Sequence, residues 1–150
     1  MNLKQLMQPA SKPALISIQP RYVEKILSGS KVLEFRRMWA AYPVDRLVIY
    51  SSSPIQRIVA VARIEDLHRS SPTALWELAK AKGGGVTRRE LYEYFNGKKS
   101  GYALELSVEI KNDRGVDPKI LFENFRPPQS FHYLAQEELA KIVLALEESR

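Results

Sequence analysis

The segment that decides the fold is residues 28–37, SGSKVLEFRR. It follows a short stretch with helical spacing of apolar residues, and within it apolar and charged side chains alternate. Successive side chains of a strand point to opposite faces, so Leu33 and Phe35 share one face while Glu34 and Arg36 share the other. Two opposite charges beside apolar neighbours indicate a polar site at the rim of a hydrophobic core.

The chain of 150 residues carries a net charge of +6, which is unevenly distributed. Residues 1–99 hold 17 Lys and Arg against 8 Asp and Glu, or +9, whereas residues 100–150 hold 6 against 9, or −3. A basic body attracts polyanions, chiefly nucleic acid, because phosphate contacts release counterions. A well-solvated basic surface without an anionic partner is the alternative, so charge alone favours nucleic acid only slightly.

The composition also excludes several classes of protein and site. Cysteine is absent, which excludes disulfides, thiolate metal ligands and a cysteine nucleophile. No apolar run approaches the roughly 18–20 residues that span a bilayer, and the N-terminus lacks a secretory pattern. We therefore expect a cytoplasmic protein without a membrane partner, while the oligomeric state stays open.

The remaining patterns predict one α+β domain at residues 14–150, after a flexible tail at residues 1–13. Apolar and polar side chains alternate most clearly at 102–110, which is the strongest strand signal. Further strands are expected at 14–18, 31–38, 47–50, 58–67 and 120–125. Helices are expected from Pro20 to Gly29, in an insertion at about 71–97, and around 139–146. Together they favour a small, mostly antiparallel β-barrel with surrounding helices, with an open α+β sheet as the alternative.

The insertion at about 71–97 carries its own local signals. Ser71 can cap a helix, and Thr87 with Glu90 forms the T-x-x-E pattern of a capping box. Between the two helices, 83–85 is Gly-Gly-Gly without the following Lys of a phosphate-binding loop, so we expect a flexible connector.

Several of these motifs together resemble the ASCH domain family. They are LISIQP at 15–20, followed by the pattern G-x-K-x-x-E-x-R at 29–36, the YSSSP segment at 50–54 and GYALEL at 101–106. The resemblance covers most of residues 14–134. It implies a PUA-like barrel with a cleft that binds RNA or a modified nucleobase. Some members of the family hydrolyse the acetyl amide of N4-acetylcytidine, and others cut RNA, so the resemblance predicts the fold better than the reaction.

Two residues of this pattern are candidates for catalysis, Lys31 and Glu34. Burial would lower the pKa of Lys31 and make it a general base, although an exposed lysine in a turn is the plainer interpretation. In a regular strand Lys31 and Glu34 would face opposite sides, so a shared site requires a bulge or a strand that begins after Lys31. In the amidohydrolases of the family a threonine nucleophile occupies the position of Glu34, which argues against the same deacetylation mechanism here.

A larger set of residues is predicted to contact nucleic acid through charge, hydroxyl groups or aromatic stacking. For each of them an ordinary structural role is the alternative, such as a salt bridge for Glu34 and Arg36 or core packing for Trp39 and Tyr102. The set is Lys31, Glu34, Arg36, Arg37, Trp39, Tyr50, Ser51, Ser52, Tyr102, Gln129 and Ser130. The two histidines, His68 and His132, lie in separate segments, so we expect no metal site and no cofactor.

Three functions remain open at this stage. The first is an RNA- or nucleotide-binding domain with a basic cleft for RNA or a modified nucleobase. The second is an enzyme acting on RNA, either a ribonuclease or an amidohydrolase on a modified cytidine. The third is a regulator that binds duplex DNA through a helix-turn-helix at 71–97, for which a helical cover over one end of the barrel is the preferred alternative.

Overall fold

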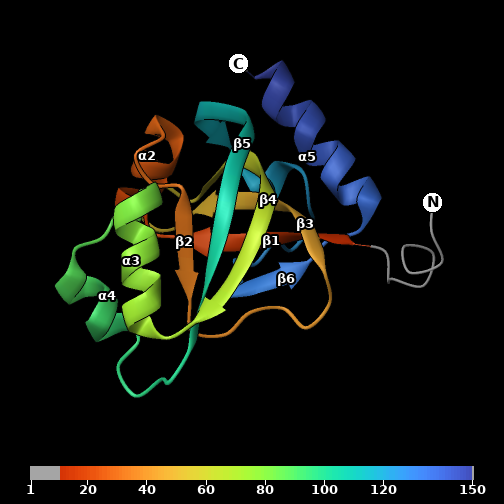
Figure 1. Ribbon diagram of the computed structural model, residues 1–150. Helices are drawn as coiled ribbons and strands as arrows, with labels where there is room; N and C mark the ends of the chain where they lie inside the picture. Colours follow the sequence, from red (N-terminus) through yellow and green to blue (C-terminus); the bar gives the residue numbers. More distant parts are fainter. Residues whose placement is uncertain (1–10, 150) are drawn as a thin grey trace.

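The computed structural model describes residues 11–149 and contains one curled sheet with helices around it (Figure 1). Its strands are β1 (Lys12–Ile18), β2 (Leu33–Arg36), β3 (Val44–Ser51), β4 (Arg57–Ser70), β5 (Gly101–Val116) and β6 (Phe131–Tyr133). Its helices are α2 (Pro20–Ser28), α3 (Pro72–Lys82), α4 (Arg88–Tyr94), α5 (Gln136–Glu148) and the short 3-10 helix η1 (Pro118–Ile120).

The strand order is β2-β5-β4-β3-β1-β6, and only the pair β1 and β3 is parallel. The predicted α+β class and the mostly antiparallel sheet are therefore confirmed. The sheet is curled into a half-barrel, with β2 and β6 at its two edges. This open form lies between the two arrangements that the sequence left open, because the curl is that of a barrel and the edges are those of a sheet.

Most predicted elements are present, and the differences are local. The strand expected at 120–125 is wrong, because Pro118 begins a 3-10 turn there and the last strand is the short β6 at Phe131–Tyr133. Strand β1 begins at Lys12, inside the expected tail, and residues 1–10 of that tail lie outside the described residues. Strand β2 begins only at Leu33, two residues later than expected.

Local chemistry explains where the helices begin and end. Pro20 occupies the first turn of α2, and Gly29 ends it in the left-handed conformation with φ of 89°. Ser71 Oγ accepts a hydrogen bond from the backbone of Ala74 at the start of α3. At α4 the capping box is complete, since Thr87 and Glu90 each accept a bond from the other's backbone N–H.

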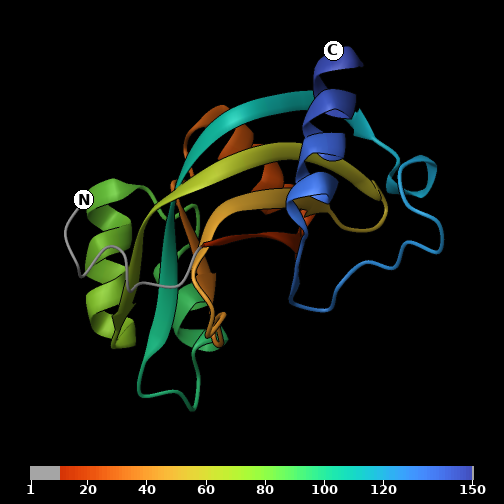
Figure 2. The same ribbon diagram turned by 90° about the vertical axis from the view of Figure 1, so that its right-hand side faces the viewer.

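The core lies on both faces of the sheet. Helix α5 covers one part with the fully buried Ile142 and Leu146, while α3 and α4 pack Leu75 and Leu91 against β2 and β5 (Figure 2). Burying each such side chain stabilises the fold by about 1.5–3 kcal/mol. Within residues 11–149, no helix combines the length and the apolar composition needed to cross a membrane.

Candidate functional site

Lys31 lies just before β2 and is buried, with only 3% of its surface exposed. Its Nζ donates a hydrogen bond to the carbonyl oxygen of Gly84 at 2.7 Å. The ammonium group also lies over the rings of Phe35 and Tyr22, at 4.9 and 5.3 Å from their centroids. Burial lowers the pKa of Lys31, and the nearby Glu34 carboxylate partly offsets this effect.

Lys31, Glu34 and Arg36 form one chain of ion pairs. Lys31 Nζ is 3.8 Å from Glu34 Oε1, and Arg36 Nη1 is 3.4 Å from Glu34 Oε2. Because β2 begins at Leu33, Lys31 is free of the strand alternation and reaches the face of Glu34. Of the two arrangements that would bring these groups together, the structure therefore uses a strand that begins after Lys31.

The three glycines between α3 and α4 hold this site together. The carbonyl oxygen of Gly83 accepts a hydrogen bond from the backbone of Val32 at 2.8 Å, and that of Gly84 accepts one from Lys31. A Cβ on Gly85, whose φ is +67°, would lie 2.7 Å from Cβ of Lys31. The expectation of a flexible connector is therefore wrong, because the glycines allow a close backbone approach that a side chain would block.

A cavity of about 910 Å³ opens beside these charges. Its volume lies within the range of small-molecule sites, roughly 300–1,000 Å³. Six of the predicted residues line it, and they come from the segment before β2, from β2 and β3, and from the loops after β3 and before β6: Lys31, Glu34, Arg36, Tyr50, Ser52 and Gln129. Three cations in its wall (Arg21, Lys31 and Arg36) face three carboxylates (Glu34, Glu90 and Glu93), so the wall is balanced in charge.

Other cavity residues were not predicted from the sequence as site residues. Tyr22 donates its hydroxyl hydrogen to Glu90 Oε2 at 2.9 Å, and Arg21 lies 3.6 Å from the same oxygen. The backbone hydrogen bond from Thr87, followed by the bond from Tyr22, lowers the pKa of Glu90 to about 2. The capping-box pattern predicted only that Glu90 lies in the first turn of a helix. No local pattern indicated that α4 would contact α2.

Aromatic hydroxyl groups add neutral polar groups to the wall. Burial is the main cause of the raised pKa of Tyr22, Tyr50 and Tyr94. All three residues line the cavity, and each keeps its hydroxyl proton at neutral pH. The cavity therefore offers flat rings together with hydroxyl groups, of which that of Tyr22 is already bonded to Glu90.

The remaining predicted residues lie around the cavity rather than in its wall. Ser130 Oγ accepts a hydrogen bond from Arg36 Nη2 at 3.0 Å, and Ser51 is buried within β3. Arg37 Nη1 donates to the backbone carbonyls of Tyr94 and Asn96, which ties it to the end of α4.

Two predicted aromatic residues also have structural neighbours of their own. Trp39 packs on Phe131, with ring centroids 4.8 Å apart. Tyr102 lies beside Arg69, whose guanidinium is 5.4 Å from the ring centroid, and is not among the cavity-lining residues.

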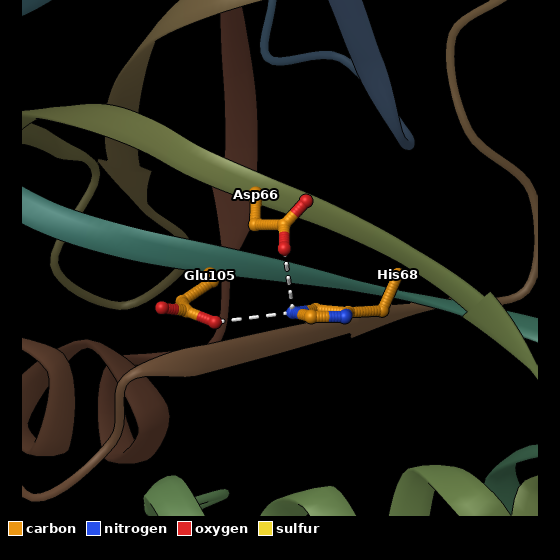
Figure 3. Close-up of side chains that lie close together, drawn as sticks. All are labelled: Asp66, His68 and Glu105. Atoms are coloured by element: carbon orange, nitrogen blue, oxygen red, sulfur yellow. Dashed lines mark hydrogen bonds and ion pairs between the residues drawn. The ribbon is translucent and has the colours of Figure 1, made fainter.

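A separate polar cluster joins Asp66, His68 and Glu105 on β4 and β5 (Figure 3). His68 Nε2 is 3.1 Å from Glu105 Oε1 and 3.7 Å from Asp66 Oδ2. The spacing of the two histidines gave no sign of this grouping, because sheet pairing places Asp66 opposite Glu105. Lys82 Nζ also lies 3.3 Å from Glu105, so the cluster already forms an ion-pair network.

The family model of the ASCH domain matches residues 16–142. The chain belongs to the ASCH domain family. A protein of Zymomonas mobilis described as an ASCH domain-containing ribonuclease is 29% identical over 138 residues, which cover 90% of this chain and 93% of that protein.

Solved structures agree with this assignment. The crystal structure of ASCH from Zymomonas mobilis has a TM-score of 0.77 at 27% identity and covers 89% of this chain and 94% of that one. The structure of a hypothetical protein from Leishmania major matches at 12% identity with a TM-score of 0.55, and the match covers 93% of this chain and 97% of that one. At this identity the similarity shows the fold alone. Membership of the ASCH family confirms the resemblance carried by residues 15–36 and is consistent with a PUA-like fold. The range that the family model matches includes helices α3 and α4.

Proposed function

We propose that this ASCH domain binds single-stranded RNA and holds one nucleotide in the cavity beside Lys31, Glu34 and Arg36. The observation that carries the proposal is the cavity itself, in which a buried chain of ion pairs meets aromatic rings and hydroxyl groups. Sequence-tolerant recognition of single strands uses such rings for base stacking and cations for phosphate. The similarity to a protein described as a ribonuclease supports an RNA ligand.

Arg36 is the residue that we expect to contact the nucleotide most directly. Its side chain is 13% exposed, and it already bonds to Glu34 and Ser130. A guanidinium has five N–H donors in a planar fork, so donors remain for a phosphate or a base edge. The balanced charge of the wall favours a base with donors and acceptors inside the cavity, and phosphates at its mouth near Arg21.

The test is binding of fluorescently labelled single-stranded RNA to the wild type and to Arg36→Ala. We expect Arg36→Ala to weaken binding about tenfold or more, because a contact of this kind contributes roughly 1–3 kcal/mol. Arg63→Ala is the matched control, since Arg63 is an exposed arginine of β4 that does not line the cavity. An unchanged dissociation constant for Arg36→Ala, or tighter binding of duplex DNA than of RNA, would overturn the proposal.

Ribonuclease activity at the same cavity is a second candidate, and two observations favour it. The Zymomonas relative is described as a ribonuclease, and burial lowers the pKa of Lys31. A lysine with a lowered pKa is suited to proton transfer. Incubation of labelled RNA with the wild type and with Lys31→Met tests this role. We expect Lys31→Met to lose cleavage and to retain RNA binding. If the wild type binds RNA without cleaving it, the ribonuclease hypothesis is wrong and the protein is an RNA-binding domain only.

The amidohydrolase alternative has less support. Glu34 occupies the position of the family's threonine nucleophile, and both of its oxygens are paired with cations. This pairing favours a positioning role for Glu34. Incubation with N4-acetylcytidine under the same conditions distinguishes the two reactions, and release of acetate would favour the amidohydrolase.

A further inference from the structure

A second hollow of about 260 Å³ adjoins the main cavity. The two spaces share three wall residues, Tyr50, Gln56 and Pro127. Tyr50 lies next to the last residue of β3, Gln56 belongs to the turn before β4, and Pro127 comes from the loop after β5, so two distant segments build this common wall. In Figure 2 that loop runs along the right-hand side of the molecule. A ligand that passes over the shared wall would contact both spaces.

The common wall is well packed. Tyr50 is only 3% exposed, and its ring packs on Phe125 with centroids 5.5 Å apart. Phe125 in turn lines the second hollow, so the aromatic pair forms one side of it. Two spaces that share a buried ring in their common wall are suited to two successive groups of one chain molecule.

The charge of the second hollow differs from that of the main cavity. Arg57 and Lys119 face into it together with a single carboxylate, Asp117. Asp117 Oδ1 accepts a hydrogen bond from the backbone of Lys119 at 3.0 Å and caps the short helix η1. Within residues 11–149, no carboxylate lies within ion-pair distance of Arg57 or Lys119. Two unpaired cations around a small hollow are suited to an anion.

The first carbon of the Arg57 side chain lies close to the backbone of Gly115. A Cβ on Gly115, whose φ is +72°, would lie 2.6 Å from Cβ of Arg57. The stem of Arg57 therefore packs directly on the backbone of Gly115 near the end of β5. The side chain leaves the strand at this point and lines the second hollow.

We infer that this second hollow binds the sugar-phosphate of the nucleotide next to the one in the main cavity, so that the ligand is an RNA chain and not a free nucleoside. The volume is just below the range of about 300–1,000 Å³ typical of whole-ligand sites, which suits a sugar-phosphate unit. Cations that neutralise a phosphate release counterions and add affinity. The inference rests on the proposed RNA-binding function and narrows its ligand class.

The experiment compares two double variants, Arg57→Gln/Lys119→Gln and the control Arg63→Gln/Arg114→Gln. All four residues are exposed, and neither control residue lines the main cavity or the second hollow. Binding of a labelled single-stranded RNA octamer is measured over a range of salt concentrations. The four ribonucleosides and a dinucleoside monophosphate serve as competitors, and melting temperatures check that every variant is folded.

We expect the Arg57→Gln/Lys119→Gln variant to bind the octamer about tenfold more weakly than the control variant. The slope of log affinity against log salt should become shallower by about 0.7, which corresponds to one lost phosphate contact. The dinucleoside monophosphate should compete better than any nucleoside, and only for proteins that keep Arg57 and Lys119.

Equal losses in both double variants, or nucleosides that compete as well as the dinucleoside monophosphate, would overturn the inference while RNA binding itself stands. Failure of the proposed function looks different, because then the wild type binds no octamer or Arg36→Ala binds it unchanged. In that case the inference fails with it.

Discussion

Arg36 Nη2 donates a hydrogen bond to Ser130 Oγ at 3.0 Å and thereby joins the two edges of the half-barrel. Arg36 ends edge strand β2, and Ser130 lies directly before edge strand β6, 94 residues later. The same guanidinium bonds to Glu34, so one side chain links the buried ion pairs, the cavity wall and the loop that precedes β6. One side chain of the proposed RNA-binding site therefore contacts that loop directly.

Ser130→Ala tests this link. Loss of the hydrogen bond should lower the free energy of unfolding by about 1 kcal/mol. It should weaken RNA binding less than Arg36→Ala does, because the Arg36 guanidinium keeps its ion pair with Glu34. Urea denaturation and RNA titration measure the two effects. Ser107→Ala on β5 removes an exposed hydroxyl as a control. Identical effects of the two serine variants would show that the link between the edges contributes nothing.

The buried ion pair of Lys31 and Glu34 should matter far more for stability than a surface pair. We expect Lys31→Met to lower the free energy of unfolding by about 3 kcal/mol, near the low end for a broken buried pair, because Arg36 still neutralises Glu34. Lys80→Met is the control, since Lys80 and Glu77 are 3.0 Å apart on the surface, and its cost should stay below about 0.5 kcal/mol. Equal costs, measured by chemical denaturation, would contradict the burial argument.

A double-mutant cycle then isolates the interaction within the buried pair. Lys31→Met, Glu34→Gln and the double variant should show a coupling free energy between about 0.5 and 3 kcal/mol, the range found for residues in contact. Additive single effects would mean that the 3.8 Å separation carries no net attraction.

The glycines beside Lys31 allow a test of steric exclusion. Gly85 and Gly97 both have positive φ, at +67° and +82°, but a Cβ on Gly97 would meet no atom within 4 Å. Gly97→Ala should therefore cost only the backbone strain, about 1–2 kcal/mol. Gly85→Ala should cost more and also weaken RNA binding, because its Cβ would push Lys31 against Glu34 and so shift the Glu34–Arg36 pair. Thermal or urea unfolding measures the stability of both variants. Equal losses of stability would refute the steric role assigned to Gly85.

The lowered pKa of Glu90 predicts that the protein loses stability in acid. Its pKa is about 2 in the folded protein against an ordinary value of 4.5, so the unfolded chain binds the proton more readily. The stabilisation from this group is present above about pH 4.5 and is lost as the pH falls towards 2. After allowance for solvent screening we expect about 1 kcal/mol.

Urea unfolding of wild type and Glu90→Gln at pH 6 and pH 3 measures this contribution. The difference between the two proteins should shrink at pH 3. Glu93→Gln, which alters an exposed carboxylate of the same helix paired with Arg89, should show no comparable change. A difference that stays constant between pH 6 and pH 3 would count against the lowered pKa of Glu90.

Helix α2 between Pro20 and Gly29, the capping box of α4 and the alternation along β5 could all be predicted from the sequence. Each depends on contacts between residues close in the chain, such as the bonds between Thr87 and Glu90. The family motif at 29–36 was visible for the same reason, because its spacing lies within one short segment.

By itself, then, the sequence determined the local elements, the α+β class and the position of the key segment. Only the tertiary structure decided that Lys31 escapes the strand alternation, that Glu90 from α4 meets Tyr22 from α2, and that Gly85 packs on Lys31. It also decided that the last strand is Phe131–Tyr133 instead of 120–125. These features depend on pairs of atoms brought together by chain segments far apart in sequence, and spacing along the chain carries no information about such pairs.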